Sequence, residues 1–186
     1  MNLKPTSFDG GNLLEKGMTE EILEIVDNDN RVIGTAGRSE IHKQHLKHRS
    51  VHVFLFNSAG ELFLQKRAQT KDEFPGYYDS SAAGHVNPGE RYHAAAEREL
   101  REELGIEAPL EKVAELPASQ ETGWEFVSFY TAVADDAVML NHDEIEEGRF
   151  SSLREIREFL LSNGDKCTPS VKTLFEIYQK RGDKII

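Results

Sequence analysis

Residues 84–106 read Gly-His-Val-Asn-Pro-Gly-Glu-Arg-Tyr-His-Ala-Ala-Ala-Glu-Arg-Glu-Leu-Arg-Glu-Glu-Leu-Gly-Ile, and this stretch decides the fold. An Asn-Pro-Gly turn leads into a run of the strong helix formers Ala, Glu, Leu and Arg, which Gly105 brings to a stop. We therefore predict a helix from about Arg91 to Leu104. Apolar side chains recur every four residues along it and form a stripe that must pack on a core: Ala96, Leu100 and Leu104.

The neighbouring face of this helix is acidic, because Glu99, Glu102 and Glu103 stand at positions i, i+3 and i+4. Like charges four residues apart destabilise a helix by about 0.2–0.5 kcal/mol, and Arg98 relieves only part of this repulsion, through Glu102. A hard divalent cation such as Mg²⁺, which prefers oxygen ligands, would resolve the conflict. The alternative interpretation is an acidic helix face exposed to water.

The remaining positions of the stretch favour the metal site. Its fixed residues are, in order, Gly84, Glu90, Arg98, Glu99, Leu100, Glu102, Glu103, Gly105 and Ile106. Together they match every specified position of the Nudix box, and a chance match in a chain of this size has a probability on the order of one in a million. The chain is identified as a member of the Nudix hydrolase superfamily. This resemblance implies an α/β fold, an α/β/α sandwich with a mixed sheet.

The resemblance also implies an enzyme that cleaves a diphosphate linked to another organic group, with Mg²⁺ as cofactor and Mn²⁺ as the alternative. The implied metal ligands are Glu99, Glu102, Glu103 and the backbone carbonyl of Ala83. The other box residues would shape the loop and hold it against the helix: Gly84, Glu90, Arg98 and Gly105. The implied partner is a small-molecule diphosphate, such as a nucleoside diphosphate derivative.

The general base is left open between the box and two later positions. Within the box the candidates are Glu102 and Glu103. The later candidates are Glu144, in an acidic turn, and Glu125, which follows Trp124. An acidic turn that is only solvated is the plain alternative for Glu144. For the substrate phosphates the candidate ligands are Lys66, Arg67 and Lys71, although a Lys-Arg pair at a strand end is often ordinary surface.

Further motifs lie outside the box: residues 64–67 (Leu-Gln-Lys-Arg), residues 74–79 (Phe-Pro-Gly-Tyr-Tyr-Asp), Gly84-His85 after a small residue, and the turn at residues 143–145 (Asp-Glu-Ile). On these motifs the chain resembles, at a lower level and over residues 21–179, isopentenyl-diphosphate isomerase and its hydrolase-like relatives. Three residues fall where the isomerase places metal ligands and its acidic catalytic residue: His48, His85 and Glu125. The other nearby histidines, His42, His45 and His52, are interpreted as solvated or core residues because their spacing is no tight metal signature.

Ala83 argues against the isomerase reaction itself. The isomerase carries its essential cysteine at this position, and another ligand Glu where this chain has Gly123. An alanine cannot donate or accept a proton, and the single thiol, Cys167, is distant in sequence. We therefore predict a hydrolase, with isomerase activity as one alternative. A non-catalytic nucleotide sensor is another, disfavoured because all the box carboxylates are present and no DNA-binding module is recognisable.

Strand and helix patterns elsewhere in the chain agree with this fold. Alternating apolar residues predict a hairpin over 20–36 and strands over 51–56, 62–66, 77–83, 112–116 and 126–133. The strand at 51–56 is apolar on both faces, which predicts burial from two sides. Ser39, Ser152 and Thr168 are predicted to cap helices. Interleaved strands and helices favour helices on both faces of a mixed sheet.

Length and charge narrow the remaining possibilities. The 186 residues predict a loose N-terminal segment over 1–18 and a single Nudix domain over 19–186. A net charge of -11 argues against a long nucleic-acid partner. The absence of a signal-like N-terminus and of long apolar runs predicts a cytoplasmic protein with no membrane partner. A homodimer is left open.

Overall fold

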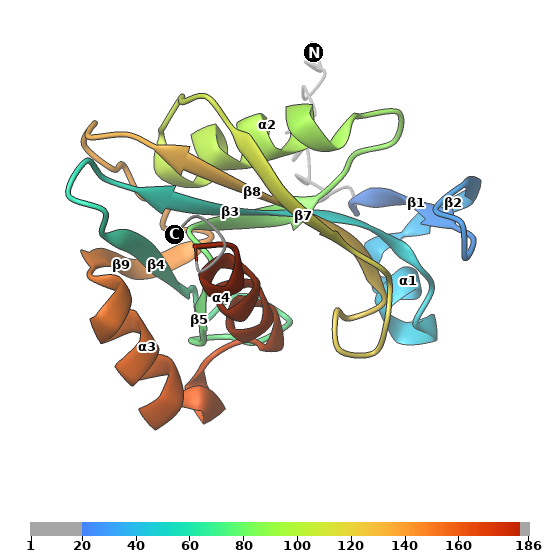
Figure 1. Ribbon diagram of the computed structural model, residues 1–186. Coiled ribbons are helices and arrows are strands. Elements are labelled where there is room, and N and C mark those ends of the chain that lie inside the picture. The colour runs from blue at the N-terminus through green and yellow to red at the C-terminus, as the bar shows by residue number, and fades with distance from the viewer. Residues whose placement is uncertain (1–19, 183–186) are drawn as a thin grey trace, which may run out of the picture.

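The computed structural model describes residues 20–182 (Figure 1), so the predicted loose segment over 1–18 lies outside the described residues. The helices are α1 Arg38–Gln44, α2 Tyr92–Leu104, α3 Leu153–Ser162 and α4 Pro169–Gly182, with a 3₁₀ turn η1 at Gly164–Lys166. The strands are β1 Ile22–Val26, β2 Val32–Gly37, β3 His48–Phe56, β4 Leu62–Arg67, β5 Tyr78–Asp79, β6 Ala82–His85, β7 Glu111–Leu116, β8 Glu125–Val133 and β9 Ile145–Ser151.

A seven-stranded sheet forms the middle layer. Its main path runs β5-β4-β3-β8-β7, while β6 pairs with β3 and β9 pairs with β4. Strands β3 and β8 are parallel and in register from His48 opposite Glu125 to Phe56 opposite Val133. The other pairs are antiparallel. The sheet is therefore mixed, which confirms the predicted fold class.

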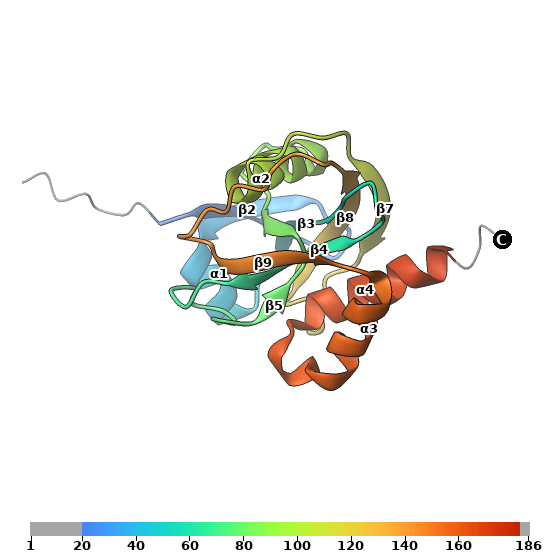
Figure 2. The same ribbon diagram turned by 90° about the vertical axis from the view of Figure 1, so that its left-hand side faces the viewer.

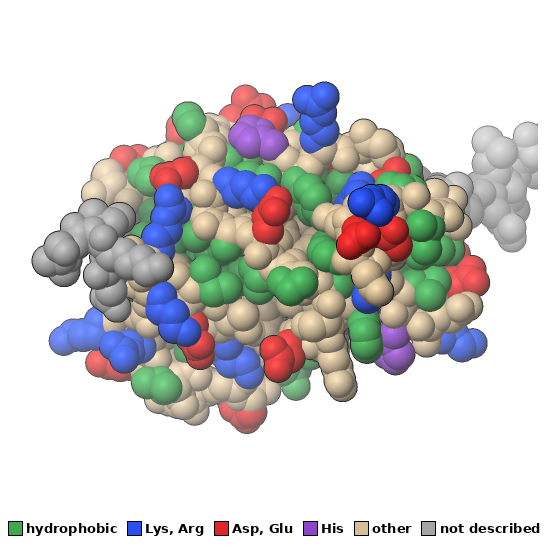
Figure 3. Space-filling view, turned by 45° about the vertical axis from the view of Figure 1, so that its right-hand side comes forward, with side chains coloured by type: hydrophobic (Ala, Val, Ile, Leu, Met, Phe, Trp, Pro, Cys, Tyr) green, Lys and Arg blue, Asp and Glu red, His purple; other side chains and the backbone are tan. Residues whose placement is uncertain are grey.

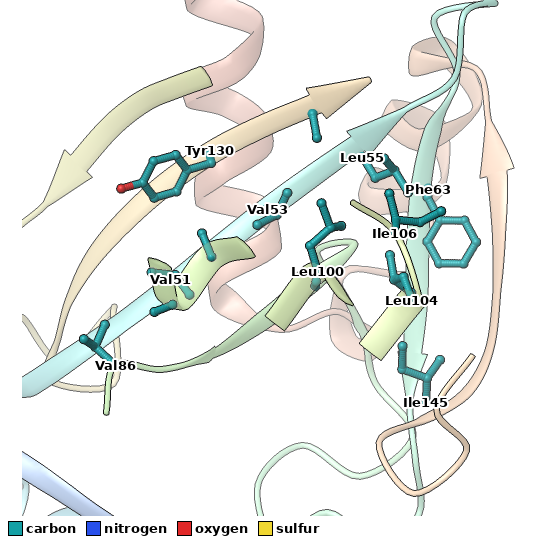
Figure 4. Packing of buried hydrophobic residues seen from close by; sticks show 14 residues of the cluster. Val51, Val53, Leu55, Phe63, Val86, Leu100, Leu104, Ile106, Tyr130 and Ile145 are labelled. Carbon is teal, nitrogen blue, oxygen red and sulfur yellow. The ribbon is translucent and has the colours of Figure 1, made fainter. Parts of the chain in front are cut away.

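Strand β3 is buried on both faces because helices cover the sheet from two sides (Figures 1 and 2). Toward α2, Val51, Val53 and Leu55 share one apolar cluster with Leu100 and Leu104 (Figure 4). Toward α3 and α4, Phe54 and Phe56 share a second cluster with Leu174. Since alternate residues of a strand point to opposite faces, one apolar run supplies both cores. This arrangement is the predicted α/β/α sandwich.

The hairpin β1–β2 and helix α1 lie together at one end of the sheet (Figure 1). The prediction that Ser39 caps this helix is wrong. Gly37 takes the extended N-cap conformation, and Ser39 lies in the first turn, where its amide and hydroxyl both donate to Glu20. The predicted caps at Ser152 and Thr168 are present, because each hydroxyl accepts a bond from the amide three residues later.

The predicted strand over 77–83 divides into β5 and β6 at Ser80 and Ser81. The buried Ser81 hydroxyl accepts from the amide of Leu55 at 2.7 Å and donates to the carbonyl of Phe63 at 2.5 Å. It thereby satisfies two backbone groups where β3 and β4 diverge, since these strands pair only at Phe56 and Leu62. The break is therefore held by side-chain hydrogen bonds that a strand pattern does not encode.

Replacing Ser81 by alanine should remove both bonds and lower the free energy of unfolding by roughly 1–3 kcal/mol, the cost of leaving a buried backbone group unpaired. Urea unfolding of the purified variant measures this change. Ser162→Ala is the matched control, since that exposed hydroxyl donates to a helical carbonyl and its loss should change stability by less than about 0.5 kcal/mol. Equal stability of the two variants would contradict the bridging role of Ser81.

The surface agrees with the acidic composition. On the face shown in Figure 3, Lys and Arg side chains are interspersed with Asp and Glu and form no continuous basic patch. Within residues 20–182, no helix is long and apolar enough to cross a membrane.

Candidate active site

Helix α2 presents the acidic face of the box. It begins after Arg91, whose backbone is extended, and ends at Gly105, which adopts the left-handed conformation with φ 67°. A side chain is strained there, so glycine suits the stop. The apolar stripe is fully buried, with Leu104 at 0% exposure. Packing of this stripe fixes the rotation of the helix and therefore the direction of its glutamates.

Glu103 is a buried carboxylate with one strong partner. Its side chain belongs to a residue that is 5% exposed, and Oε2 accepts from Nε2 of Gln65 at 2.7 Å. The amide of Ala83 lies 3.4 Å from the same oxygen. Burial, followed by the charge of Glu99, raises the pKa of Glu103 well above its usual range.

Glu99 lies close to the backbone of the loop before the helix. A Cβ added to Gly84 would overlap the Glu99 carboxylate, so only glycine leaves room for that side chain. Burial raises the pKa of Glu99, and the neighbouring Arg98 offsets only part of the effect. Two carboxylates on adjacent turns of α2 are therefore both destabilised in their charged form, as expected where a divalent cation is to bind.

Arg98 ties the loop to the helix through more contacts than the sequence predicts. Its Nε and Nη2 donate to the two oxygens of Glu90 at 3.0 and 2.9 Å, and Nη2 also donates to the carbonyl of His85 at 2.9 Å. Its Nη1 donates to Glu99 at 2.6 Å and to Glu102 at 3.2 Å. Arg98 therefore reduces the repulsion among the glutamates by pairing with Glu99 as well as with Glu102.

A cavity of about 410 Å³ opens beside these residues. It is lined by most of the residues that the sequence singled out: Arg67, Lys71, Ala83, Gly84, Arg98, Glu99, Glu102, Glu103, Glu125 and Glu144. Lys71 forms an ion pair with Glu144 across the cavity, joining the loop after β4 to the turn before β9. Basic and acidic side chains that are distant in sequence therefore line the same cavity.

The structure does not bring Lys66 to this cavity. Its ammonium nitrogen lies 2.7 Å from Oε1 of Glu146 and 3.7 Å from Glu147, both on β9. Successive residues of a strand point in opposite directions, so Lys66 and Arg67 cannot both face the same space. We therefore correct that prediction and assign Lys66 to the β4–β9 surface.

A second cluster of possible metal ligands adjoins the cavity, which two of its members, His85 and Glu125, line. It contains His42 from α1, His48 from β3, His85 from β6 and Glu125 from β8, with ligand atoms all within 4.8 Å of one another. We call this set the histidine quartet. Glu125 Oε1 lies 3.5 Å from Nε2 of His48 and 3.8 Å from Nε2 of His85. Imidazole nitrogens with a carboxylate are typical ligands of Zn²⁺ and related ions.

Charges within the histidine quartet are paired. Burial alone would raise the pKa of Glu125, but the neighbouring imidazoles of His48 and His85 outweigh it and hold that pKa well below its usual range. Burial opposes the charged form of His85, yet its bonds to Glu125 and Glu21 raise its pKa to about 9. Nε2 of His48 and both ring nitrogens of His42 are enclosed without an aligned hydrogen-bond partner.

Sequence reasoning missed His42. Its Nδ1 lies 3.1 Å from a carboxylate oxygen of Glu73, in the loop after β4. The six-residue spacing to His48 is not a metal signature, and the other two members come from β6 and β8. The pairing of β3 with β6 and with β8, together with the placement of α1, unites the four residues. The resemblance to the isomerase was the sequence signal for His48, His85 and Glu125, and it did not include His42.

The sandwich and its glutamate-bearing helix define a Nudix-type fold. The family model described as NUDIX domain matches residues 46–170. The chain belongs to the Nudix family, and it is a Nudix hydrolase.

Relatives of the chain include two bacterial proteins. Isopentenyl-diphosphate Delta-isomerase 2 of Photorhabdus laumondii is 34% identical over 155 residues, covering 80% of this chain and 87% of the relative. An uncharacterized Nudix hydrolase of Pseudomonas aeruginosa is 38% identical over 131 residues, covering 70% and 78%. The crystal structure of DR0079 from Deinococcus radiodurans aligns with a TM-score of 0.75 and 27% identity, covering 84% of this chain and 98% of that one.

Proposed function

We propose that the protein hydrolyses the diphosphate linkage of a nucleoside diphosphate derivative or a related organic diphosphate. The observation that carries this proposal is the pair of carboxylates Glu99, which is partly buried, and Glu103, which is buried; both have a raised pKa, and both line a cavity that Arg67 also lines. Mg²⁺, with Mn²⁺ as the alternative, would be held by the three box glutamates and the Ala83 carbonyl. When bound, it supplies positive charge at the phosphoryl oxygens and activates water.

Arg67 and Lys71 would hold the phosphates of the substrate. Both side chains line the cavity of a protein whose net charge of -11 otherwise repels phosphate. Arg67 is positioned by the carbonyl of Glu73, which accepts from its Nε at 3.2 Å and its Nη2 at 3.1 Å. Its Nη1 lies 3.5 Å from Asp79, so the guanidinium has a fixed orientation.

Among the general-base candidates outside the box, the geometry favours Glu144 over Glu125. The pKa of Glu125 lies well below its usual range, because the two neighbouring imidazoles outweigh the effect of burial, and so weak a base is a poor proton acceptor. Glu144 lines the cavity and has Lys71 as its ion-pair partner. A shift of that lysine to the substrate phosphate would release Glu144 toward the attacking water.

Isomerase activity remains the disfavoured alternative despite the name of one relative. Ala83 lines the cavity with a methyl group, which transfers no proton. The single cysteine, Cys167, is buried against the apolar cluster around Phe54 and does not line the cavity. The residues that line the described cavity therefore include no thiol.

The proposal is tested by a Mg²⁺-dependent screen with phosphorus NMR, which identifies the bond that breaks. The panel contains nucleotide sugars, dinucleotides, nucleoside triphosphates, coenzyme A and ADP-ribose. ADP-ribose is included because it is bound by the NUDIX domain of Shewanella oneidensis NrtR, which shares the fold at 16% identity and a TM-score of 0.58. We expect cleavage of at least one diphosphate and no interconversion of isopentenyl and dimethylallyl diphosphate. Either interconversion or an inert panel contradicts the proposal.

We further propose that the histidine quartet binds a transition-metal ion, as the resemblance to the isomerase implies. Metal-free protein titrated with Zn²⁺ should bind one tight equivalent, and His48→Gln should weaken this binding by at least about 10-fold because a buried ligand is lost. His93→Gln is the matched control, since His93 lies half-exposed on α2 and outside the quartet. Equal zinc affinity of the two variants contradicts the assignment.

A further inference from the structure

One wall of the cavity is unusually polar for a surface so deeply buried. On β3, the residues facing away from α2 are His48, Ser50 and His52 before the apolar Phe54 and Phe56 begin. Ser50 is 3% exposed and His52 is 5% exposed, yet both line the cavity. Buried polar groups are normally hydrogen-bonded, so any polar atom of these two side chains without a partner is available to bind a ligand.

His52 has one ring nitrogen in use and one free. Its Nδ1 lies 2.7 Å from the Ser80 hydroxyl, which in turn lies 3.4 Å from the carbonyl of Ala82. Either the hydroxyl donates to Nδ1, leaving a proton on Nε2, or Nδ1 donates and Nε2 becomes an acceptor. In both cases Nε2 has no hydrogen-bond partner among residues 20–182. The contact with Ser80 therefore fixes the orientation of the His52 ring and leaves Nε2 available to bind a ligand group.

Ser50 adds a second unused polar atom on the same face of the strand. Its hydroxyl is enclosed and has no hydrogen-bond partner within the described residues. An enclosed hydroxyl without a partner is uncommon because its desolvation is not compensated. Ser128, on β8, has the same property, but it stands opposite Val51 in the parallel pairing and therefore faces α2, away from this wall.

Strand pairing places this wall next to the proposed reaction centre. In the antiparallel pairing of β3 with β6, His52 stands opposite Ala83 and Ser50 stands opposite His85. Side chains of directly opposed residues lie on the same face of a sheet. His52 is thus the neighbour of Ala83 on this face, and both residues line the cavity. Gly84, between Ala83 and His85, turns toward Glu99 on the other face.

The wall is also held rigidly. The buried Asp79 accepts from the Ser80 amide at 2.8 Å and from the Thr168 hydroxyl at 2.9 Å, and its second oxygen lies 3.5 Å from Arg67. These contacts connect the partner of His52 to the start of α4 and to the proposed phosphate ligand. Preorganised polar groups discriminate well, because a ligand that fails to pair with them leaves them desolvated.

We infer that this cavity selects diphosphates whose organic group carries hydroxyl or other hydrogen-bonding groups, such as a sugar, over diphosphates of alkyl chains. His52 and Ser50 are its specificity-determining residues, and Ser80 positions His52. An alkyl group placed against this wall would leave both side chains without partners, whereas a sugar hydroxyl can donate to or accept from each. This inference rests on the proposed function and narrows its substrate class.

The test compares kcat/KM for two polar substrates, ADP-ribose and UDP-glucose, with that for two alkyl substrates, dimethylallyl and geranyl diphosphate. The better polar substrate should exceed the better alkyl substrate by at least about 100-fold, because sites that hydrogen-bond a substrate group discriminate strongly against its absence. His52→Leu should reduce this ratio at least about 10-fold, whereas His52→Gln, which keeps a hydrogen-bonding group, should retain most of it.

Ser50→Ala should also lower the ratio, and Ser128→Ala is its matched control, since it removes a similar buried hydroxyl from the opposite face of the sheet. Thermal unfolding verifies that each variant is folded, and Ser50→Ala carries the test if His52→Leu does not fold. Calorimetric binding of ADP-ribose and dimethylallyl diphosphate separates the proposed selectivity from the proposed hydrolysis.

If ADP-ribose binds more tightly than dimethylallyl diphosphate but is not turned over, the proposed hydrolysis is contradicted and the proposed selectivity is supported. The proposed selectivity is overturned if the alkyl diphosphate binds as tightly as ADP-ribose or more tightly. It is also overturned if the polar-to-alkyl ratio of kcat/KM is unchanged in Ser50→Ala and in folded His52→Leu.

Discussion

Replacing Glu103 by glutamine is expected to abolish Mg²⁺-dependent hydrolysis and, at the same time, to stabilise the metal-free protein at neutral pH. The carboxylate is buried beside Glu99, and burial followed by that charge raises its pKa well above the usual range. Glutamine keeps the size and the contact with Gln65 but removes the charge that the metal requires. Loss of one metal ligand should lower kcat/KM on the order of 10³-fold, equivalent to several kcal/mol of lost transition-state stabilisation.

The stability gain has a defined pH dependence. Because the folded state raises the pKa of Glu103, it binds this proton more tightly than the unfolded chain does. Metal-free wild-type protein therefore loses stability as the pH rises above the unfolded-state pKa of about 4.3, and the loss is complete above the folded-state pKa. Glu103→Gln does not undergo this loss, so its advantage should be absent near pH 4 and largest at neutral pH.

Urea unfolding in a chelator, at pH 5 and pH 7.5, measures this difference alongside the activity assay. Glu97→Gln is the control, since that carboxylate is about half exposed on the same helix and does not line the cavity. It should leave both activity and stability nearly unchanged. A Glu103→Gln variant that is active, or that is less stable than wild type in chelator at neutral pH, would show that Glu103 is a structural carboxylate.

The parts of the fold that were predictable from sequence are those set by local periodicity. The stripe ending at Leu104 fixed which face of α2 is buried, and Gly105 marked its end within a residue. The two-sided apolar run of β3 indicated that helices cover both faces of the sheet, as Phe54 and Val53 demonstrate by entering different clusters. In each case the physical signal lies within one element, so no knowledge of its neighbours was needed.

The features that escaped prediction depend on contacts between distant elements. His42 joins His48 and Glu125 only because α1, which packs on the β1–β2 hairpin, reaches the first residues of the parallel strands β3 and β8. Lys66 turned away from the cavity because β9 supplies Glu146 as its partner. Ser39 was a reasonable cap by residue type, but its hydroxyl is engaged by Glu20, which precedes β1. Residue type sets what a side chain can do, whereas tertiary pairing decides which of those options it takes.

Gly84→Ala offers a separate test of the metal site, because it changes no charged residue. The added methyl group would overlap the carboxylate of Glu99, and that carboxylate is the end of a flexible side chain that can swing away. Since the backbone of Gly84 does not have positive φ, alanine should cost less than about 0.5 kcal/mol in stability. Displacement of Glu99 should nevertheless weaken Mg²⁺ binding and activity by roughly 10–100-fold, as loss of ligand orientation does at other metal sites.

Gly34→Ala is the matched control, since a Cβ there would meet only Ile25, at 4.0 Å, and Gly34 also lies in a strand without positive φ. Magnesium titration of activity and thermal unfolding of both variants give the comparison. Gly84→Ala should require more Mg²⁺ for half-maximal activity while melting close to wild type. Wild-type magnesium dependence in a folded Gly84→Ala variant would mean that Glu99 does not ligate the metal. The box would then reduce to Glu102 and Glu103, and the glycine would serve only the packing of β6 against α2.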